Sequence, residues 1–141
     1  MDIVETHAFH PPKSSYDDNT FNSFDYDIHE FGNLEPASVT IHYLFYLAGT
    51  GAMPSRDNPV RLLRKTTILY FHGNACDIGS LESFGKQMSE QCDVNFIAVE
   101  YPGYGCSTII HGSEKKIAPS EKWAYMAVEA MLGELSSVWG I

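Results

Sequence analysis

A short polar segment, His72-Gly73-Asn74-Ala75, directly follows an apolar run over residues 66–71. The glycine lets the backbone turn sharply and come close to a bound group. Backbone N–H groups exposed at such a strand-to-helix turn can hold a developing negative charge, as an oxyanion hole does. The segment therefore predicts an anion-binding turn, although an ordinary strand-to-helix connection also fits these residues.

A second candidate loop follows the next apolar run, residues 94–99. Gly103 and Gly105 allow a tight loop at the carboxyl end of a strand, where α/β proteins bind ligands. The third glycine of a dinucleotide fingerprint is missing, because position 108 is threonine, and no G-x-S-x-G nucleophile motif occurs in the chain. The two loops predict a site at one sheet edge, without a recognisable nucleophile.

The sequence supports other kinds of site less strongly. Cys106 could act as a nucleophile with His111 as its base, but the spacing supplies no third group to orient the histidine. Zinc binding by His72 and Cys76 lacks the usual ligand pairs. His42 stands alone on a predicted strand, where a histidine is usually structural.

The loops must be positioned by strands and helices, which hydrophobic periodicity predicts. Alternating patterns over 24–28 and 39–47 predict two strands joined as an antiparallel hairpin, with His42 on the face of the second strand opposite Val39. A helix in which Leu81, Phe84 and Met88 face the core joins the strands at 66–71 and 94–99. This connection predicts a right-handed βαβ crossover.

The remaining sequence predicts a loop over 108–118 and then a helix that begins near Pro119 and ends at Gly140. One helical stripe is expected to face the core: Trp123, Met126, Ala127, Ala130, Met131, Leu135 and Val138. The element order β-β-β-α-β-α indicates an α/β fold. We expect residues 1–22 to be an irregular lead-in and residues 23–141 to form one partial domain.

Composition narrows the class of protein. The chain has 141 residues, of which 44% are hydrophobic, and a net charge of −9, so a globular domain is expected and a nucleic-acid or anionic-lipid surface is not. Neither a membrane-spanning run nor a signal peptide is predicted. Three cysteines without C-x-x-C spacing are typical of reduced thiols, which predicts an intracellular, cytoplasmic protein.

The two candidate loops, with their flanking strands, resemble a known family. Residues 68–79 and 99–107 are similar to the third strand, its oxyanion turn and the following strand and loop of the serine hydrolases of the α/β-hydrolase superfamily. The branch most similar is the eukaryotic α/β-hydrolase-domain proteins that include protein depalmitoylases. The clear resemblance covers residues 66–141, with Glu100 where the family has aspartate.

The resemblance implies hydrolysis of ester or thioester bonds, palmitoyl-protein among them, through a covalent acyl-enzyme and without a cofactor. One oxyanion donor would be the backbone N–H of Asn74, with Ala75 as the alternative. His72 and Gly73 would support that turn, and Gly103 and Gly105 would shape the neighbouring loop. The family's cysteine-rich N-terminus has no counterpart here, since no cysteine precedes Cys76, which leaves peripheral membrane association unsupported.

In the family, the nucleophile, the acid and the base of the catalytic triad follow the region that matches this chain. We therefore expect an N-terminal part of a serine hydrolase, truncated before the fifth strand. A catalytically inactive paralogue that acts as a binding module is the alternative. The family's third strand lies between the fourth and the fifth, so residues 66–71 would form an open edge, which favours self-association or pairing with a partner.

Overall fold

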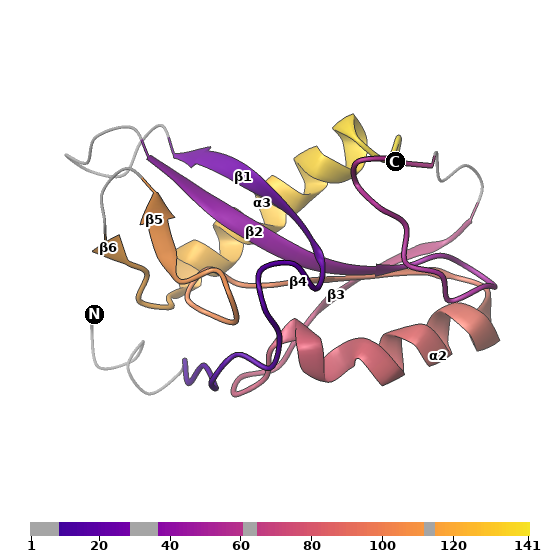
Figure 1. The fold of residues 1–141 in the computed structure, drawn as a ribbon, viewed down its shortest axis with the longest axis horizontal. Helices are drawn as coiled ribbons and strands as arrows, with labels where there is room; N and C mark the ends of the chain where they lie inside the picture. Colours follow the sequence, from indigo (N-terminus) through magenta and orange to yellow (C-terminus); the bar gives the residue numbers. More distant parts are fainter. Residues whose placement is uncertain (1–8, 29–36, 61–64, 112–114) are drawn as a thin grey trace.

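The computed structural model describes residues 9–28, 37–60, 65–111 and 115–141 (Figure 1). In chain order its elements are β1 (Asn22–Ile28), β2 (Ala37–Tyr46), β3 (Thr67–Phe71), the 3₁₀ helix η1 (Ile78–Leu81), α2 (Glu82–Cys92), β4 (Asn95–Val99), β5 (Ile109–His111), β6 (Lys115–Lys116) and α3 (Glu121–Ser137).

The strands form one mixed sheet around β2. β1 pairs antiparallel with β2 along one edge, while β4 and β5 share the other edge, so that Tyr43 lies opposite both Asn22 and Val99. β3 lies parallel to β4 with Phe71 opposite Val99. The spatial order β1-β2-β4-β3 contains the predicted antiparallel pair and the predicted β3–α2–β4 crossover.

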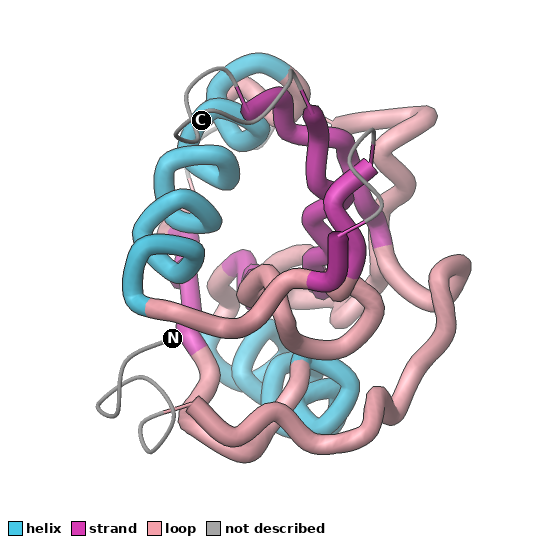
Figure 2. The backbone as a smooth tube through the Cα atoms, turned by 90° about the vertical axis from the view of Figure 1, so that its left-hand side faces the viewer, coloured by secondary structure: helices cyan, strands magenta, loops and turns pink. Residues whose placement is uncertain are grey.

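The two long helices cover opposite faces of this sheet (Figures 1 and 2). The face of β2 that carries Ile41 and Tyr43 packs with α3, whereas Leu44 on the other face packs in a second cluster beside η1. The predicted alternation along β2 is therefore confirmed. α3 buries the expected stripe: Trp123, Ala127, Ala130, Met131 and Leu135, with Met126 and Val138 partly buried beside them.

Three local predictions were wrong. The expected loop over 108–118 contains the strands β5 and β6, because Val39 at the start of β2 offers a free edge to Ile110. Phe84 is 44% exposed, since η1 precedes α2 and the fully buried side chain there is Ile78. Pro119 precedes the N-cap of α3, Ser120, rather than lying in the first helical turn.

Two glycines secure the helices. A Cβ atom at Gly85 would lie 2.6 Å from the ring of Phe96, so this glycine allows α2 to approach the sheet closely. Gly140 has a φ of 70°, and the N–H of Ile141 donates to the carbonyl of Leu135 at 3.0 Å, which closes the C-terminus of α3 as predicted.

Candidate functional site

The two glycine-bearing loops meet at the carboxyl ends of β3 and β4. The Tyr101 hydroxyl donates to the carbonyl oxygen of His72 at 3.0 Å, and the Tyr104 hydroxyl donates to Oδ1 of Asn74 at 3.1 Å. Burial raises the pKa of Tyr101 to about 12, so this phenol keeps its proton at neutral pH. The sequence predicted that these loops share one sheet edge, and the two tyrosines hold them together.

His72 lies wholly beneath this surface, paired with Glu100. Its Nε2 is 2.7 Å from Oε1 of Glu100, and neither side chain is exposed. Its Nδ1 is 2.9 Å from the carbonyl oxygen of Gly73. Both ring nitrogens therefore lie within hydrogen-bond distance of an oxygen, which fixes the orientation of the ring.

The second carboxylate oxygen of Glu100 binds two further groups. Oε2 accepts from the Tyr16 hydroxyl at 2.6 Å and from the backbone N–H of Ile78 at 3.2 Å. Burial, with the charge of Glu100, raises the pKa of Tyr16 well above its usual range, so Tyr16 remains a donor. No motif in the sequence indicated this contact, because Tyr16 lies outside the region of clear resemblance.

The residues of the turn that follow His72 are exposed. Asn74 and Ala75 lie at the surface, and Ala75 has a φ of 62°, a left-handed conformation uncommon for residues other than glycine. Oδ1 of Asn74 accepts from the N–H of Ala75 at 3.0 Å and from the N–H of His10 at 2.7 Å. The Ala75 amide would therefore have to leave Asn74 before it could donate to an oxyanion.

Gly103 and Gly105 both have positive φ, 96° and 53°. A Cβ atom at position 103 would lie 2.9 Å from the backbone of Pro119, and one at position 105 would lie 2.4 Å from Oε2 of Glu100. A larger residue at position 103 would therefore collide with Pro119, and one at position 105 would collide with the buried Glu100.

These features define an α/β protein whose two loops occupy the sheet edge at which this class of protein binds ligands. About half of the chain is similar to curated proteins of one kind. It is 37% identical over 75 residues to the alpha/beta hydrolase domain-containing protein aho-3 of Caenorhabditis elegans, which is 53% of this chain and 20% of aho-3. It is 36% identical over 77 residues to the human alpha/beta hydrolase domain-containing protein 17B, 55% of this chain and 24% of that protein.

Protein 17C of Xenopus tropicalis is similar to the same extent, 36% identical over 75 residues, which are 53% of this chain and 22% of the relative. The match thus covers a quarter or less of each of these three relatives. No family model and no solved structure matches the chain. The chain carries a partial match to the alpha/beta hydrolase domain-containing proteins.

The alternative nucleophile Cys106 and its candidate base His111 lie in a separate hollow of about 290 Å³. His42 also lines this hollow. Burial raises the pKa of the Cys106 thiol, and its Sγ donates to the carbonyl of Tyr16 at 3.4 Å. Nε2 of His111 lies 2.9 Å from Oγ1 of Thr40. This environment favours the neutral thiol, which is a poor nucleophile.

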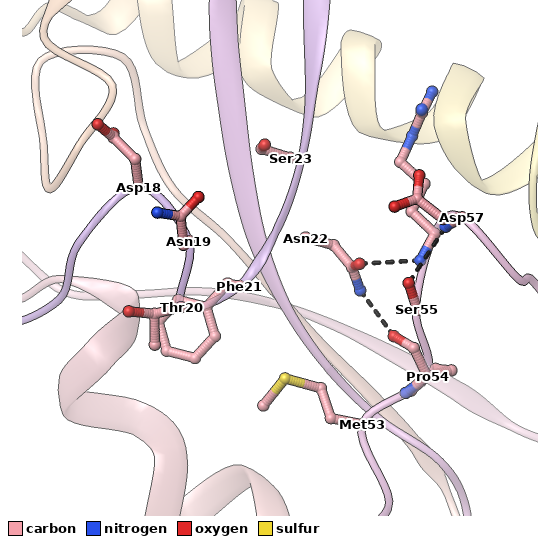
Figure 3. Close-up of a pocket in the computed structure, with 11 residues that line it drawn as sticks. Asp18, Asn19, Thr20, Phe21, Asn22, Ser23, Met53, Pro54, Ser55 and Asp57 are labelled. Atoms are coloured by element: carbon pink, nitrogen blue, oxygen red, sulfur yellow. Dashed lines mark hydrogen bonds between the residues drawn. The ribbon is translucent and has the colours of Figure 1, made fainter.

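Within the described residues, no group of three or more His, Cys, Asp or Glu side chains could hold a metal ion. No helix in that part of the chain is long and apolar enough to cross a membrane. A hollow of about 430 Å³ lies between residues 18–23 and 53–57, whose two walls are joined by hydrogen bonds of Asn22 to Pro54 and Arg56 (Figure 3).

His42 is buried beside the site, only 2% exposed. Its Nδ1 has no hydrogen-bond partner within the described residues. Burial lowers the pKa of His42, opposed by the negative charges of Asp18 and Glu100. The folded protein therefore holds His42 neutral at a pH at which the unfolded chain binds a proton.

The stability of the protein should fall as the pH is lowered below about 6.5, the pKa of an unperturbed histidine, because only the unfolded state then gains the proton. His42 contributes a slope of at most about 1.4 kcal/mol per pH unit. Urea unfolding at pH 7, 6 and 5 measures the slope, and His42→Phe should make it shallower. Equal slopes for the two proteins would contradict a depressed pKa of His42.

Proposed function

We propose that this chain supplies one half of a serine-hydrolase site that cleaves ester or thioester bonds, with palmitoyl-protein thioesters among the candidate substrates. The backbone N–H of Asn74 would serve as one oxyanion donor. The observation that carries the proposal is the joining of the turn at 72–75 to the loop at 100–107 by side-chain hydrogen bonds at the carboxyl ends of β3 and β4. The partial match to alpha/beta hydrolase domain-containing proteins supports the same function.

An oxyanion donor is effective when it is held in place before the charge develops. The pair of His72 and Glu100 is buried directly beneath the turn, and both nitrogens of His72 are engaged. His72 therefore supports the turn and leaves the role of catalytic base to another histidine. In the proposed assembly, that histidine would belong to the polypeptide that follows the matched region.

The nucleophile must come from elsewhere, since no G-x-S-x-G occurs in this sequence. We propose that the polypeptide bearing the nucleophile pairs along β3. All five residues of β4 are buried, whereas β3, with no second neighbouring strand among the described residues, leaves Phe71 37% exposed. A run of apolar residues without polar alternation is typical of a strand covered on both faces with a neighbour on each side. Such a strand would come from the additional length of the relatives, since the match covers only 20% of aho-3 and 24% of protein 17B.

Complementation tests this function. The chain would be coexpressed with the segment of human protein 17B that follows the matched stretch, and the purified assembly treated with a fluorophosphonate probe and an acyl thioester. We expect labelling of the 17B segment and thioester hydrolysis in the assembly, and neither with this chain alone. Labelling of the chain alone would overturn the proposal by revealing a nucleophile within it.

A separate variant tests the role of the Asn74 backbone N–H as an oxyanion donor. Asn74→Pro removes the backbone N–H and should reduce hydrolysis about 10²–10³-fold in the assembly. Copurification of the two polypeptides shows whether the variant still assembles. Unchanged hydrolysis by an intact Asn74→Pro assembly would exclude Asn74 as the donor.

The open edge of β3 also favours the alternative function, a non-catalytic binding module. In that case the chain would associate through residues 66–71, either with itself or with the 17B segment, and the assembly would hydrolyse nothing. Sedimentation of the chain with and without Leu69→Lys measures self-association, because a charge on this strand should block pairing. Self-association without hydrolysis in any assembly would establish this alternative.

A further inference from the structure

We propose that residues 10–16, here called the N-terminal strap, hold the candidate oxyanion turn and the β4 loop in register, with Tyr16 as the positioning residue. The strap lies outside the region of clear resemblance. Its contacts are independent of the chemistry of the turn. What the positioned turn accomplishes rests on the proposed function.

The strap contacts the turn at Asn74 and the N-cap of η1 at Asp77 before it reaches the buried pair of His72 and Glu100. The N–H of His10 donates to Oδ1 of Asn74 at 2.7 Å. The backbone N–H and the hydroxyl of Ser15 donate to the two carboxylate oxygens of Asp77 at 2.7 Å and 2.6 Å. Asp77 also caps η1 by accepting from Ser80, so the strap is fastened to the residue that starts the next helix.

Tyr16 joins the two loops. Its hydroxyl donates to Oε2 of Glu100 at 2.6 Å and accepts from the backbone N–H of Cys106 at 3.3 Å. Glu100 in turn binds His72 through its other oxygen. A single phenol therefore connects the loop after β4 with the buried pair that supports the turn after β3.

Two glycines make room for the strap. A Cβ atom at Gly79 would lie 2.2 Å from the Ser15 hydroxyl, and one at Gly105 would lie 2.1 Å from the Tyr16 hydroxyl. These glycines belong to different parts of the chain, because Gly79 lies in η1 and Gly105 lies in the loop after β4. A segment that merely lay over the surface would not require close approach at both places, so the strap is fitted to its position.

A cross-link tests where the strap lies. Oγ of Ser14 is 3.7 Å from Sγ of Cys106, so Ser14→Cys places two thiols within reach of a disulfide. We expect mild oxidation of the full chain to join positions 14 and 106, seen as a shift on a non-reducing gel and as a linked peptide by mass spectrometry. Asn19→Cys is the matched control, because it adds an exposed thiol to the same region. No linkage in Ser14→Cys, or equal linkage to Cys106 in the control, would overturn the strap.

Hydrogen exchange tests what the strap does. Tyr16→Phe removes the hydroxyl that binds the buried carboxyl group of Glu100, so amides of residues 73–77 should exchange more than about tenfold faster. Amides within α3 report global stability in the same sample and should change less. Tyr125→Phe is the control, because that hydroxyl binds Glu121 at the surface. Equal acceleration in the turn and in α3 would reduce Tyr16 to a general stabiliser and overturn its positioning role.

The outcomes separate the two proposals. A linked strap and a turn that loosens in Tyr16→Phe, with no hydrolysis by the 17B assembly, would remove the proposed function and leave the strap. Hydrolysis that is unchanged by Tyr16→Phe, with no selective loosening of the turn, would remove the strap and leave the function.

Discussion

Replacing Glu100 with alanine is expected to lower the free energy of unfolding by about 3–5 kcal/mol, because it removes one partner of a buried, hydrogen-bonded pair. His72 would remain fully buried with Nε2 unpaired, and the Tyr16 hydroxyl and the N–H of Ile78 would lose their acceptor. Total stabilities of small domains are only about 5–15 kcal/mol. A large share of the folded population should be lost, as measured by urea unfolding followed by tryptophan fluorescence.

Two further variants show whether the loss of stability comes from the lost hydrogen bonds of Glu100 or from the mere removal of a glutamate side chain. Glu100→Gln keeps an oxygen that can accept from Tyr16 and an amide that can donate to neutral His72, so it should cost less than Glu100→Ala. Glu121→Ala removes a carboxylate at the exposed start of α3 and should change stability by about 0.5 kcal/mol or less. A loss below about 1 kcal/mol for Glu100→Ala would contradict an essential buried pair.

The elements with strong periodicity could be predicted from the sequence. Alternation along β2 assigns its two faces correctly because every second side chain meets the same helix. The stripe on α3 and the glycine at position 140 fix the orientation and the end of that helix. In each case the signal lies within a few residues of the structure it specifies.

The elements that failed depend on partners elsewhere in the chain. β5 and β6 are only 3 and 2 residues long, and β5 is a strand because β2 offers an open edge beside Val39. Phe84 satisfies a helical stripe, yet the 3₁₀ turn before α2 places Ile78 in the core instead. The hydrophobic pattern of neighbouring residues could not predict either the strand pairing of β5 or the burial of Ile78.

The site divides in the same way. Gly103 and Gly105 marked the second loop, and the structure places it against the turn at 72–75. The bonds that fasten these loops join residues 84 positions apart for Tyr16 and Glu100, and 28 positions apart for His72 and Glu100. No spacing rule connects such residues, so the support of the turn emerges only from the folded chain.

A second buried carboxylate, Glu134, was also hidden in the sequence, because it lies on the core-facing side of α3 among apolar residues. Its Oε2 accepts from the Tyr43 hydroxyl at 2.7 Å and from Nε of Arg56 at 2.5 Å, and its Oε1 accepts from Nη2 of Arg56 at 3.1 Å. The indole N–H of Trp139 donates to Tyr43 at 3.0 Å. Three segments of the chain, β2, the loop at Arg56 and α3, thus meet at one carboxylate, and Trp139 is joined to them through Tyr43.

Glu134→Ala should lower the free energy of unfolding by about 3–5 kcal/mol, as expected for removal of one partner of a buried, hydrogen-bonded pair. Arg56 is 38% exposed and can turn toward water, but the Tyr43 hydroxyl cannot, which keeps the expected loss large. Glu134→Gln retains an acceptor for Tyr43 and should cost less. A loss in Glu134→Ala no greater than in Glu121→Ala would contradict this role.

The two buried acids, Glu100 and Glu134, allow a controlled test of the candidate site, in which Glu134→Ala serves as the control for Glu100→Ala. Glu134 binds no residue of the turn, whereas Glu100 holds His72 directly beneath it. Hydrogen exchange would be measured for each variant at a urea concentration the same interval below that variant's own unfolding midpoint. Under these conditions, Glu100→Ala should accelerate exchange at residues 73–77 more than in the rest of the protein. Glu134→Ala should accelerate exchange in the turn and in α3 to the same extent. If both variants behaved alike, the Glu100 pair would serve the whole fold and would have no special part in holding an oxyanion donor in place.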